Sequence, residues 1–185
     1  HELSDYQKVM VVHKGKLITG CLSDATTSNI NIPVVAYDLD DEGNIDATKP
    51  INNFWPKLPG AKLSVGPLDP GSDKTGRYHH IPFIYKDSLY VVHAEALVKD
   101  GKTYHSLYRL KLNNDARPIG GWTKVSRVGH FPGWLHSPCI LVGDYLYVVN
   151  GRYVSRGKFD SSGNIPEFKL FYTVKEFADG SSEAR

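Results

Sequence analysis

The sequence has few sulfur-containing residues and no long apolar run: two cysteines and one methionine occur among 185 residues. Two thiols as far apart as Cys21 and Cys139 form neither a disulfide framework nor a zinc site, since both need several cysteines at close spacing. Buried free thiols in strands are one interpretation, and a single bridge is the other. The longest apolar runs, residues 89–92 and 145–149, are strand length, whereas a membrane-spanning helix needs about 20 residues.

The sequence also has no large excess of positive or negative charge: the formal net charge is +2, and no block of like charge occurs. We therefore expect no nucleic-acid partner and no membrane partner. The sequence contains no N-x-S/T acceptor site, so glycosylation gives no support for secretion. The first residue is His1, which indicates a removed signal or propeptide, or a fragment, and extracellular location is slightly favoured.

Helical periodicity with capping residues is absent as well, while aromatic residues and turn formers are abundant. The chain has 11 tyrosines, seven phenylalanines and three tryptophans, together with 17 glycines and 11 prolines. Large flat side chains pack well on strands, and glycine and proline mark turns. The composition favours an all-β protein.

Three segments repeat one pattern: residues 8–20, 80–94 and 136–151. Each has an apolar run, a short polar turn and a second apolar run that ends in small residues, which predicts a β-hairpin. The predicted turns are Lys14-Gly15, Lys86-Asp87 and Gly143-Asp144. Because the apolar runs are nearly continuous, we expect both faces of each sheet to be covered.

A third strand with an aromatic residue is expected after each hairpin, at residues 34–39, 107–112 and 170–174. Trp55 and Trp122 then precede a fourth strand and are expected to pack between sheets. The third copy ends at Arg185 before a matching tryptophan. Four short strands per repeat are typical of β-propeller blades, so the predicted fold is all-β, with three four-stranded antiparallel blades, the last incomplete. The predicted boundaries are 1–66, 67–134 and 135–185.

Three blades cannot close a ring, because a propeller needs about four to eight. An uncovered sheet face and a free edge also invite aggregation. We therefore expect further propeller blades as partners, contributed by a homodimer mate or by another fragment of the same protein.

The repeat resembles the kelch-type and sialidase-like propeller families. The kelch resemblance rests on the small residues that end the second strand (Thr19-Gly20, His93-Ala94 and Asn150-Gly151), then Tyr37 or Tyr108, then Trp55 or Trp122. The sialidase resemblance rests on His80-Ile81-Pro82 before a hairpin that ends Val92-His93-Ala94-Glu95, with an Asp-box echo at residues 40–43. This chain has His80 where that family has arginine, and the kelch double glycine is degraded in every copy. The resemblance implies a propeller and, for the second family, activity on carbohydrate.

Propellers bind ligands at the mouth of the central channel, where the loops enter the innermost strands. Two such loops carry the candidate ligand-binding residues, which are Arg77, His79, His80, Trp134 and His136. Aromatic, histidine and arginine side chains suit a sugar, a carboxylate or a peptide loop. The histidines have three interpretations: backbone hydrogen bonding at a strand start, ligand contact, or metal binding and proton transfer.

One acidic segment follows the first third strand and imitates a calcium loop. Asp38, Asp40 and Glu42 stand at alternate positions, and Gly43 and Ile45 fit the EF-hand spacing, but Lys49 stands where a bidentate glutamate belongs. An acidic turn between strands is the favoured interpretation. No cofactor and no metal are therefore expected.

Three functional hypotheses follow from these residues. The first is a binding or interaction module that holds a glycan or a partner protein on the channel face. The second is a carbohydrate-active hydrolase of the sialidase-like class, which would use arginines such as Arg77, Arg127 and Arg152 together with paired acidic groups. The third is a structural subunit of a larger assembly. No catalytic set can be named from the sequence, so whether the protein is an enzyme stays open.

Overall fold

A computed structural model of the chain describes residues 8–21, 34–51, 55, 56, 58, 81–99, 102–131, 139–150 and 153–174. These residues form strands and turns without helix. The strands are β1 (Lys8–His13), β2 (Lys16–Cys21), β3 (Val35–Asp38), β4 (Ile81–Tyr85), β5 (Ser88–Lys99), β6 (Lys102–Leu112), β7 (Pro118–Phe131), β8 (Cys139–Val142), β9 (Tyr145–Asn150), β10 (Tyr153–Lys158) and β11 (Phe168–Thr173). Nothing in these described ranges is a helix long and apolar enough to cross a membrane.

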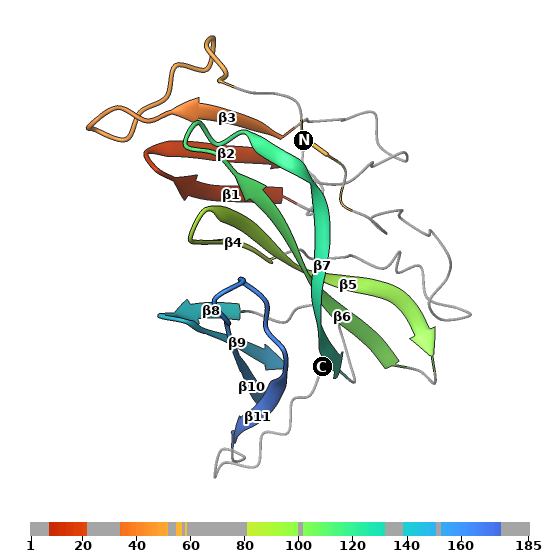
Figure 1. Ribbon diagram of the computed structural model, residues 1–185. Helices are drawn as coiled ribbons and strands as arrows, with labels where there is room; N and C mark the ends of the chain where they lie inside the picture. The colour runs from red at the N-terminus through yellow and green to blue at the C-terminus, as the bar shows by residue number, and fades with distance from the viewer. Residues whose placement is uncertain are drawn as a thin grey trace, which may run out of the picture.

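The strands form three antiparallel sheets that follow one another along the chain (Figure 1). Their strand orders are β1-β2-β3, β4-β5-β6-β7 and β8-β9-β10-β11, so every strand pairs with its neighbour in sequence. Such meandering sheets of three or four strands are the blades of a propeller. We name them blade one, blade two and blade three. The predicted all-β, blade-type fold is confirmed.

The three predicted hairpins are present with the predicted turns. His13 pairs with Lys16, Tyr85 with Ser88, and Val142 with Tyr145, so each turn contains two residues. Two-residue turns suit antiparallel strands because their backbone twist matches that of the strands. The local pattern of apolar runs and polar turns therefore decided the strand pairing here.

The prediction that blade three is incomplete was wrong. Residues 170–174, expected as its third strand, belong to the fourth strand β11, and the third strand is β10. β10 was missed because its sequence, YVSRGK, has no apolar run. Gly157 of β10 is buried, and a side chain there would overlap Ile165. Packing thus selects glycine where the pattern of the other blades has a large apolar residue.

Blade one, by contrast, has three strands within the described residues. Trp55 follows them and packs against the core between blades one and two, as does Trp122 on β7. The indole N–H of Trp122 donates a hydrogen bond of 2.8 Å to the carbonyl of Pro56. The expected role of both tryptophans, packing between sheets, agrees with this arrangement.

Blade two is covered on both faces, as the near-continuous apolar runs predicted. Leu89 and Val91 point into a core shared with blade one, whereas Tyr90 and Val92 point into a second core shared with blade three. Successive strand residues face opposite sides, so one strand feeds both cores. Each core is continued by the facing sheet, with Ile18 on blade one and Leu146 on blade three.

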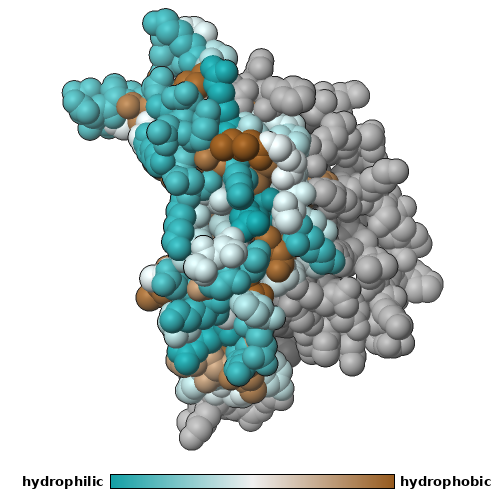
Figure 2. Space-filling view, in the orientation of Figure 1, coloured by the Kyte–Doolittle hydropathy of each residue, from teal (hydrophilic) through white to brown (hydrophobic). Residues whose placement is uncertain are grey.

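The outward faces of blades one and three carry exposed apolar side chains. On blade one they are Met10, 73% exposed, and Val12, 54% exposed. On blade three they include Ile140, Val142 and Phe171. Figure 2 shows hydrophobic atoms at the surface of the lowest sheet, which is blade three, while the loop that projects after β3 is hydrophilic. Apolar faces of this kind mark interaction surfaces in soluble proteins.

Candidate functional site

The array of blades has two ends. At the entry end, the first strands β4 and β8 begin, at Ile81 and Cys139. At the turn end lie the three hairpin turns and the loops that follow β3, β6 and β10. The candidate residues Arg77, His79, His80, Trp134 and His136 directly precede β4 or β8 in the sequence, and all five lie outside the described residues, so they stay predictions.

A ribbon of blade two projects beyond β4 at the entry end. Ile81, the first residue of β4, pairs with Val92, but β5 continues to Lys99 and returns as β6. The strand β7 pairs along this extension to Phe131. The backbone register brings Glu95, Tyr104 and His130 level with one another across the three strands. The start of β4 therefore lies at the base of a three-stranded wall (Figure 1).

The hairpin register also corrects how the candidate histidines align. Pro82 pairs with Val91, and Cys139 pairs with Val148, at the same distance from their turns. Counted back along the sequence, His136 is level with His79, whereas the His-x-Pro pattern had matched it with His80. The alignment was misled because three residues separate Pro82 from its turn, whereas four separate Pro138 from its turn.

At the turn end, a five-residue loop repeats once in every blade. We call these the Asx loops, at residues 40–44, 113–117 and 160–164. In each, the first residue accepts two backbone N–H groups on its side-chain oxygen and forms two backbone bonds across the loop. The fourth residue has a positive φ, at Gly43, Ala116 and Gly163. Sequence reasoning missed this repeat, although Asp-x-x-Gly-Asn occurs in both the first and the third loop.

The first Asx loop is the segment that imitates a calcium site. The Asp40 carboxylate accepts the N–H groups of Glu42 and Asn44, and these hydrogen bonds, above all the one from Asn44, lower the pKa of Asp40. Asp38 instead pairs with Lys16 at 2.9 Å. No group of three His, Cys, Asp or Glu side chains that could hold a metal ion occurs in the part of the chain that the structure describes. The loop has the hydrogen bonding of an acidic turn.

The second Asx loop lies against blade one. The buried His13 contacts the carbonyl of Asn113 at 3.2 Å, and Lys14 donates to the side chain of Asn114 at 2.6 Å. Lys14 also pairs with Asp87 of the neighbouring hairpin turn at 2.6 Å, which lowers the pKa of Asp87. His13, the last residue of β1, is therefore a buried histidine with a hydrogen-bonding partner.

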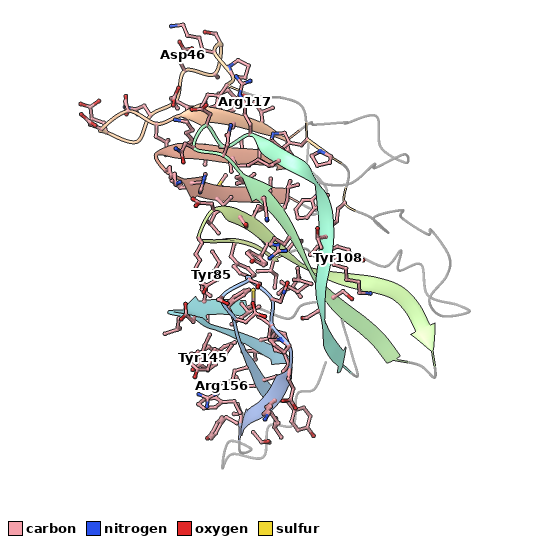
Figure 3. The ribbon with its side chains drawn as sticks, viewed as in Figure 1. Asp46, Tyr85, Tyr108, Arg117, Tyr145 and Arg156 are labelled. Atoms are coloured by element: carbon pink, nitrogen blue, oxygen red, sulfur yellow. The ribbon has the colours of Figure 1, made fainter. Side chains whose placement is uncertain are left out.

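The third Asx loop lies against blade two through a tyrosine and an arginine. Tyr90 donates to the carbonyl of Gly163 at 2.7 Å, and Arg109 donates to the carbonyl of Ser162 at 2.5 Å. Burial raises the pKa of Tyr90. Tyr85 donates to Asp144 of the next hairpin turn at 2.6 Å, and burial together with this bond raises its pKa (Figure 3).

A cavity of about 380 Å³ lies beside this contact. Its charged lining residues are Lys86, Asp87, Arg109 and Lys111, and the third Asx loop closes one side. Lys86 lies 5.0 Å from the centre of the Tyr85 ring, and Asp87 is paired with Lys14. Two of these four charged residues, Asp87 and Arg109, are thus already engaged in contacts that join the blades.

The structure describes some of the arginines and cysteines that the sequence analysis singled out. Arg127 lies on β7, where its backbone pairs with Ser106, while Arg77 and Arg152 lie outside the described residues. Cys139 carries a free thiol, and burial raises its pKa to about 12. A thiol with so high a pKa is almost entirely protonated near neutral pH, so it is a weak nucleophile.

Comparison with known proteins finds similar solved structures but assigns the chain to no family. No protein-family model and no curated protein matches the chain. Among solved structures, it is similar to a GH43 glycoside hydrolase engineered for endo-xylanase and exo-arabinofuranosidase activity, with 11% identity, a TM-score of 0.43 and coverage of 90% of this chain and 32% of the other. It is also similar to a GH32 beta-fructofuranosidase from Bombyx mori solved with sucrose, with 13% identity, a TM-score of 0.35 and coverage of 87% and 36%.

The chain thus spans about a third of the length of each of these two structures. At these TM-scores and identities, neither likeness carries an argument about function. The kelch part of the resemblance stays a prediction, and so do the blade boundaries at residues 66 and 134.

Proposed function

We propose that these three blades are a section of a propeller that binds a carbohydrate ligand at the entry end. The observation that carries the proposal is the contrast between the two ends. At the turn end, Tyr85, Tyr90 and Arg109 are engaged in blade-to-blade hydrogen bonds. At the entry end, the extended ribbon of blade two stands beside the start of β4.

The residue types at this end suit a sugar. Arg77, His79 and His80 precede β4, and Trp134 and His136 precede β8. Aromatic rings pack on the apolar face of a sugar ring, while arginine and histidine donate hydrogen bonds to hydroxyl or carboxylate groups. Ligand sites combine aromatic side chains with a small number of polar groups, and these five residues have that composition.

The test is binding of the full chain to a glycan array, repeated with the double variant His80→Ala/His136→Ala and with Trp134→Ala. We expect the wild type to bind and each variant to lose at least about tenfold in affinity, which equals about 1.4 kcal/mol. The matched control is Lys86→Ala/Lys111→Ala at the turn end, which should bind like the wild type. Binding that survives both entry-end variants, or no glycan bound at all, would contradict the proposal.

A carbohydrate-active hydrolase is the second candidate, and one observation favours it. The register aligns Glu95, Tyr104 and His130 at the entry end, and carboxylate, phenol and imidazole are groups that transfer protons in catalysis. Some glycosidases use tyrosine as the nucleophile. Turnover of a panel of fluorogenic glycosides separates this candidate from simple binding.

A further inference from the structure

Blade two holds the third Asx loop with a Tyr–Arg pair whose geometry leaves no room for a side chain at position 163 of the loop. Tyr90 and Arg109 are paired across β5 and β6, and they bind two successive carbonyls, those of Gly163 and Ser162. A Cβ atom on Gly163 would lie 2.6 Å from the Tyr90 oxygen and 2.9 Å from Arg109 Nη1. This contact therefore requires glycine at the fourth position of the docked loop.

Blade three carries the same pair at the same place. Tyr147 and Arg156 are paired across β9 and β10, and Tyr147, like Tyr90, is the third residue of the second hairpin strand. They face outward, away from blade two. Arg156 stacks on Phe171 and Tyr145, 4.4 Å and 5.1 Å from the ring centres, and Tyr147 contacts the Phe171 ring edge-on (Figure 3). The pair is thus already held in position by aromatic neighbours.

Blade one carries a loop that fits this pair. The first Asx loop has the sequence Asp-x-x-Gly-Asn of the third loop and the same four hydrogen bonds. All five of its residues are exposed, and a Cβ atom on Gly43 would meet nothing within 4 Å. The second loop is different, since it has Ala116 in place of glycine and docks on His13 and Lys14.

The blades therefore use two kinds of junction. Blades one and two join through His13 and Lys14 with an alanine-containing loop, and blades two and three join through a Tyr–Arg pair with a glycine-containing loop. Among the described residues, the second kind leaves one half undocked at each end of the array: the half-buried Tyr–Arg pair of blade three and the exposed glycine-containing loop of blade one.

We propose that blade three binds blade one of a second copy of this chain, head to tail. In this contact Tyr147 donates to the carbonyl of Gly43 and Arg156 to the carbonyl of Glu42, as Tyr90 and Arg109 do within the chain. The acidic side chains of Asp41 and Glu42 meet the cationic side chains of Arg156 and Lys158, and opposite charges favour this pairing. This inference does not depend on the proposed carbohydrate ligand.

The outward apolar faces cover each other in the same contact. Met10 and Val12 of one copy lie against the face that carries Ile140, Val142 and Phe171 of the other. A head-to-tail contact closes into a ring when the rotation between copies allows it. Two copies give six blades, which is within the range of about four to eight in known propellers.

The test measures the mass of the full chain by sedimentation velocity over a range of concentrations. We expect a dimer, and we expect Arg156→Ala and Gly43→Ala each to raise the dimer dissociation constant about ten- to a hundredfold. The matched control is Gly120→Ala, because Gly120 also has a positive φ and open space around its Cβ but lies on β7. It should dimerise like the wild type.

A mixing experiment separates head-to-tail association from a symmetric contact. The Arg156→Ala chain keeps an intact loop and the Gly43→Ala chain keeps an intact Tyr–Arg pair, so a mixture contains one complete contact. We expect the mixture to associate more tightly than either variant alone. A wild-type monomer at about 100 µM, a dimer that resists both variants, or a mixture no tighter than its components would each overturn the proposal. If further blades of a longer chain close the ring instead, the wild-type chain should be a monomer at that concentration.

Discussion

The two junctions between blades have similar geometry but different chemistry. Between blades one and two the core is mainly aliphatic, with Ile18, Leu89 and Leu110 buried and two tryptophans at its margin. Between blades two and three it is mainly aromatic: Tyr85 stacks on Phe159 at 4.1 Å between ring centres, and Phe83 stacks on Tyr90 at 5.4 Å. A blade can therefore be repeated while the surface that joins it to its neighbour is not.

The polar contacts of the two junctions differ in the same way. The first uses an exposed ion pair between Lys14 and Asp87 and a contact of the buried His13 with a backbone carbonyl. The second uses a buried tyrosine hydroxyl on a glycine carbonyl. Because each loop fits one kind of partner, the order of blades is set at the junctions rather than within the blades. The following changes test that difference, beginning with the largest expected effect.

Truncation of the aromatic core should have the largest effect. Phe159→Ala removes a ring that contacts Tyr85, Tyr90 and Phe83, and it should lower the free energy of unfolding by about 3–5 kcal/mol. Ile18→Ala at the aliphatic junction should cost about 2–5 kcal/mol by the same argument. Urea unfolding followed by tryptophan fluorescence measures both.

The control for truncation is Leu170→Ala, at a side chain that is 62% exposed, which should change stability by less than about 0.5 kcal/mol. If Phe159→Ala cost no more than this control, the aromatic cluster would not be the core of the second junction.

Two glycines with the same backbone conformation separate docking from local strain. Gly163→Ala adds a Cβ beside Tyr90 and Arg109 and should cost about 1–2 kcal/mol for its positive φ plus about 1–3 kcal/mol for overpacking. Gly43→Ala should cost only the first of these amounts in the monomer, because its surroundings are open. Thermal or urea unfolding at low protein concentration compares them, and equal losses would show that the Tyr90 contact is not tight.

The smallest effect is expected from the exposed ion pair of the first junction. Because Lys14 lowers the pKa of Asp87 below 3.8, the pair stabilises the folded state above the ordinary aspartate pKa and loses this contribution as the pH falls through the lowered value. In Lys14→Met, the pKa of Asp87 should rise towards 3.8, as measured by NMR titration of the carboxyl carbon.

Asp46 serves as the internal reference in that titration, since its pKa is lowered mainly by the Thr48 hydroxyl and should not change in the variant. An Asp87 pKa that stays the same without Lys14 would assign the shift to another cause.

Features that depend on neighbours in sequence were predicted from the sequence. The turns at Lys14, Lys86 and Gly143 and the strands around them follow from alternating apolar runs and polar residues. The prediction of the third strand of blade three failed because that strand depends on contacts with distant residues. Gly157 packs against Ile165, and Arg156 stacks on the rings of Tyr145 and Phe171. The Asx loops were not predicted because their hydrogen bonds depend on the backbone conformation of five residues. The acidic composition of the first loop indicated only an acidic turn that imitates a calcium loop.

The candidate entry-end residues, Arg77, His79, His80, Trp134 and His136, remain predictions from the sequence, placed by the starts of β4 and β8. By itself the sequence determined that the protein is all-β, that it repeats a hairpin three times and where those hairpins turn, because each hairpin is encoded by two apolar runs and a polar turn that are adjacent in the chain. Only the tertiary structure decided which blade surfaces match, because the Tyr90 hydroxyl and the Gly163 carbonyl that it binds are 73 residues apart in the chain. A contact between residues so far apart cannot be predicted from the sequence around either of them.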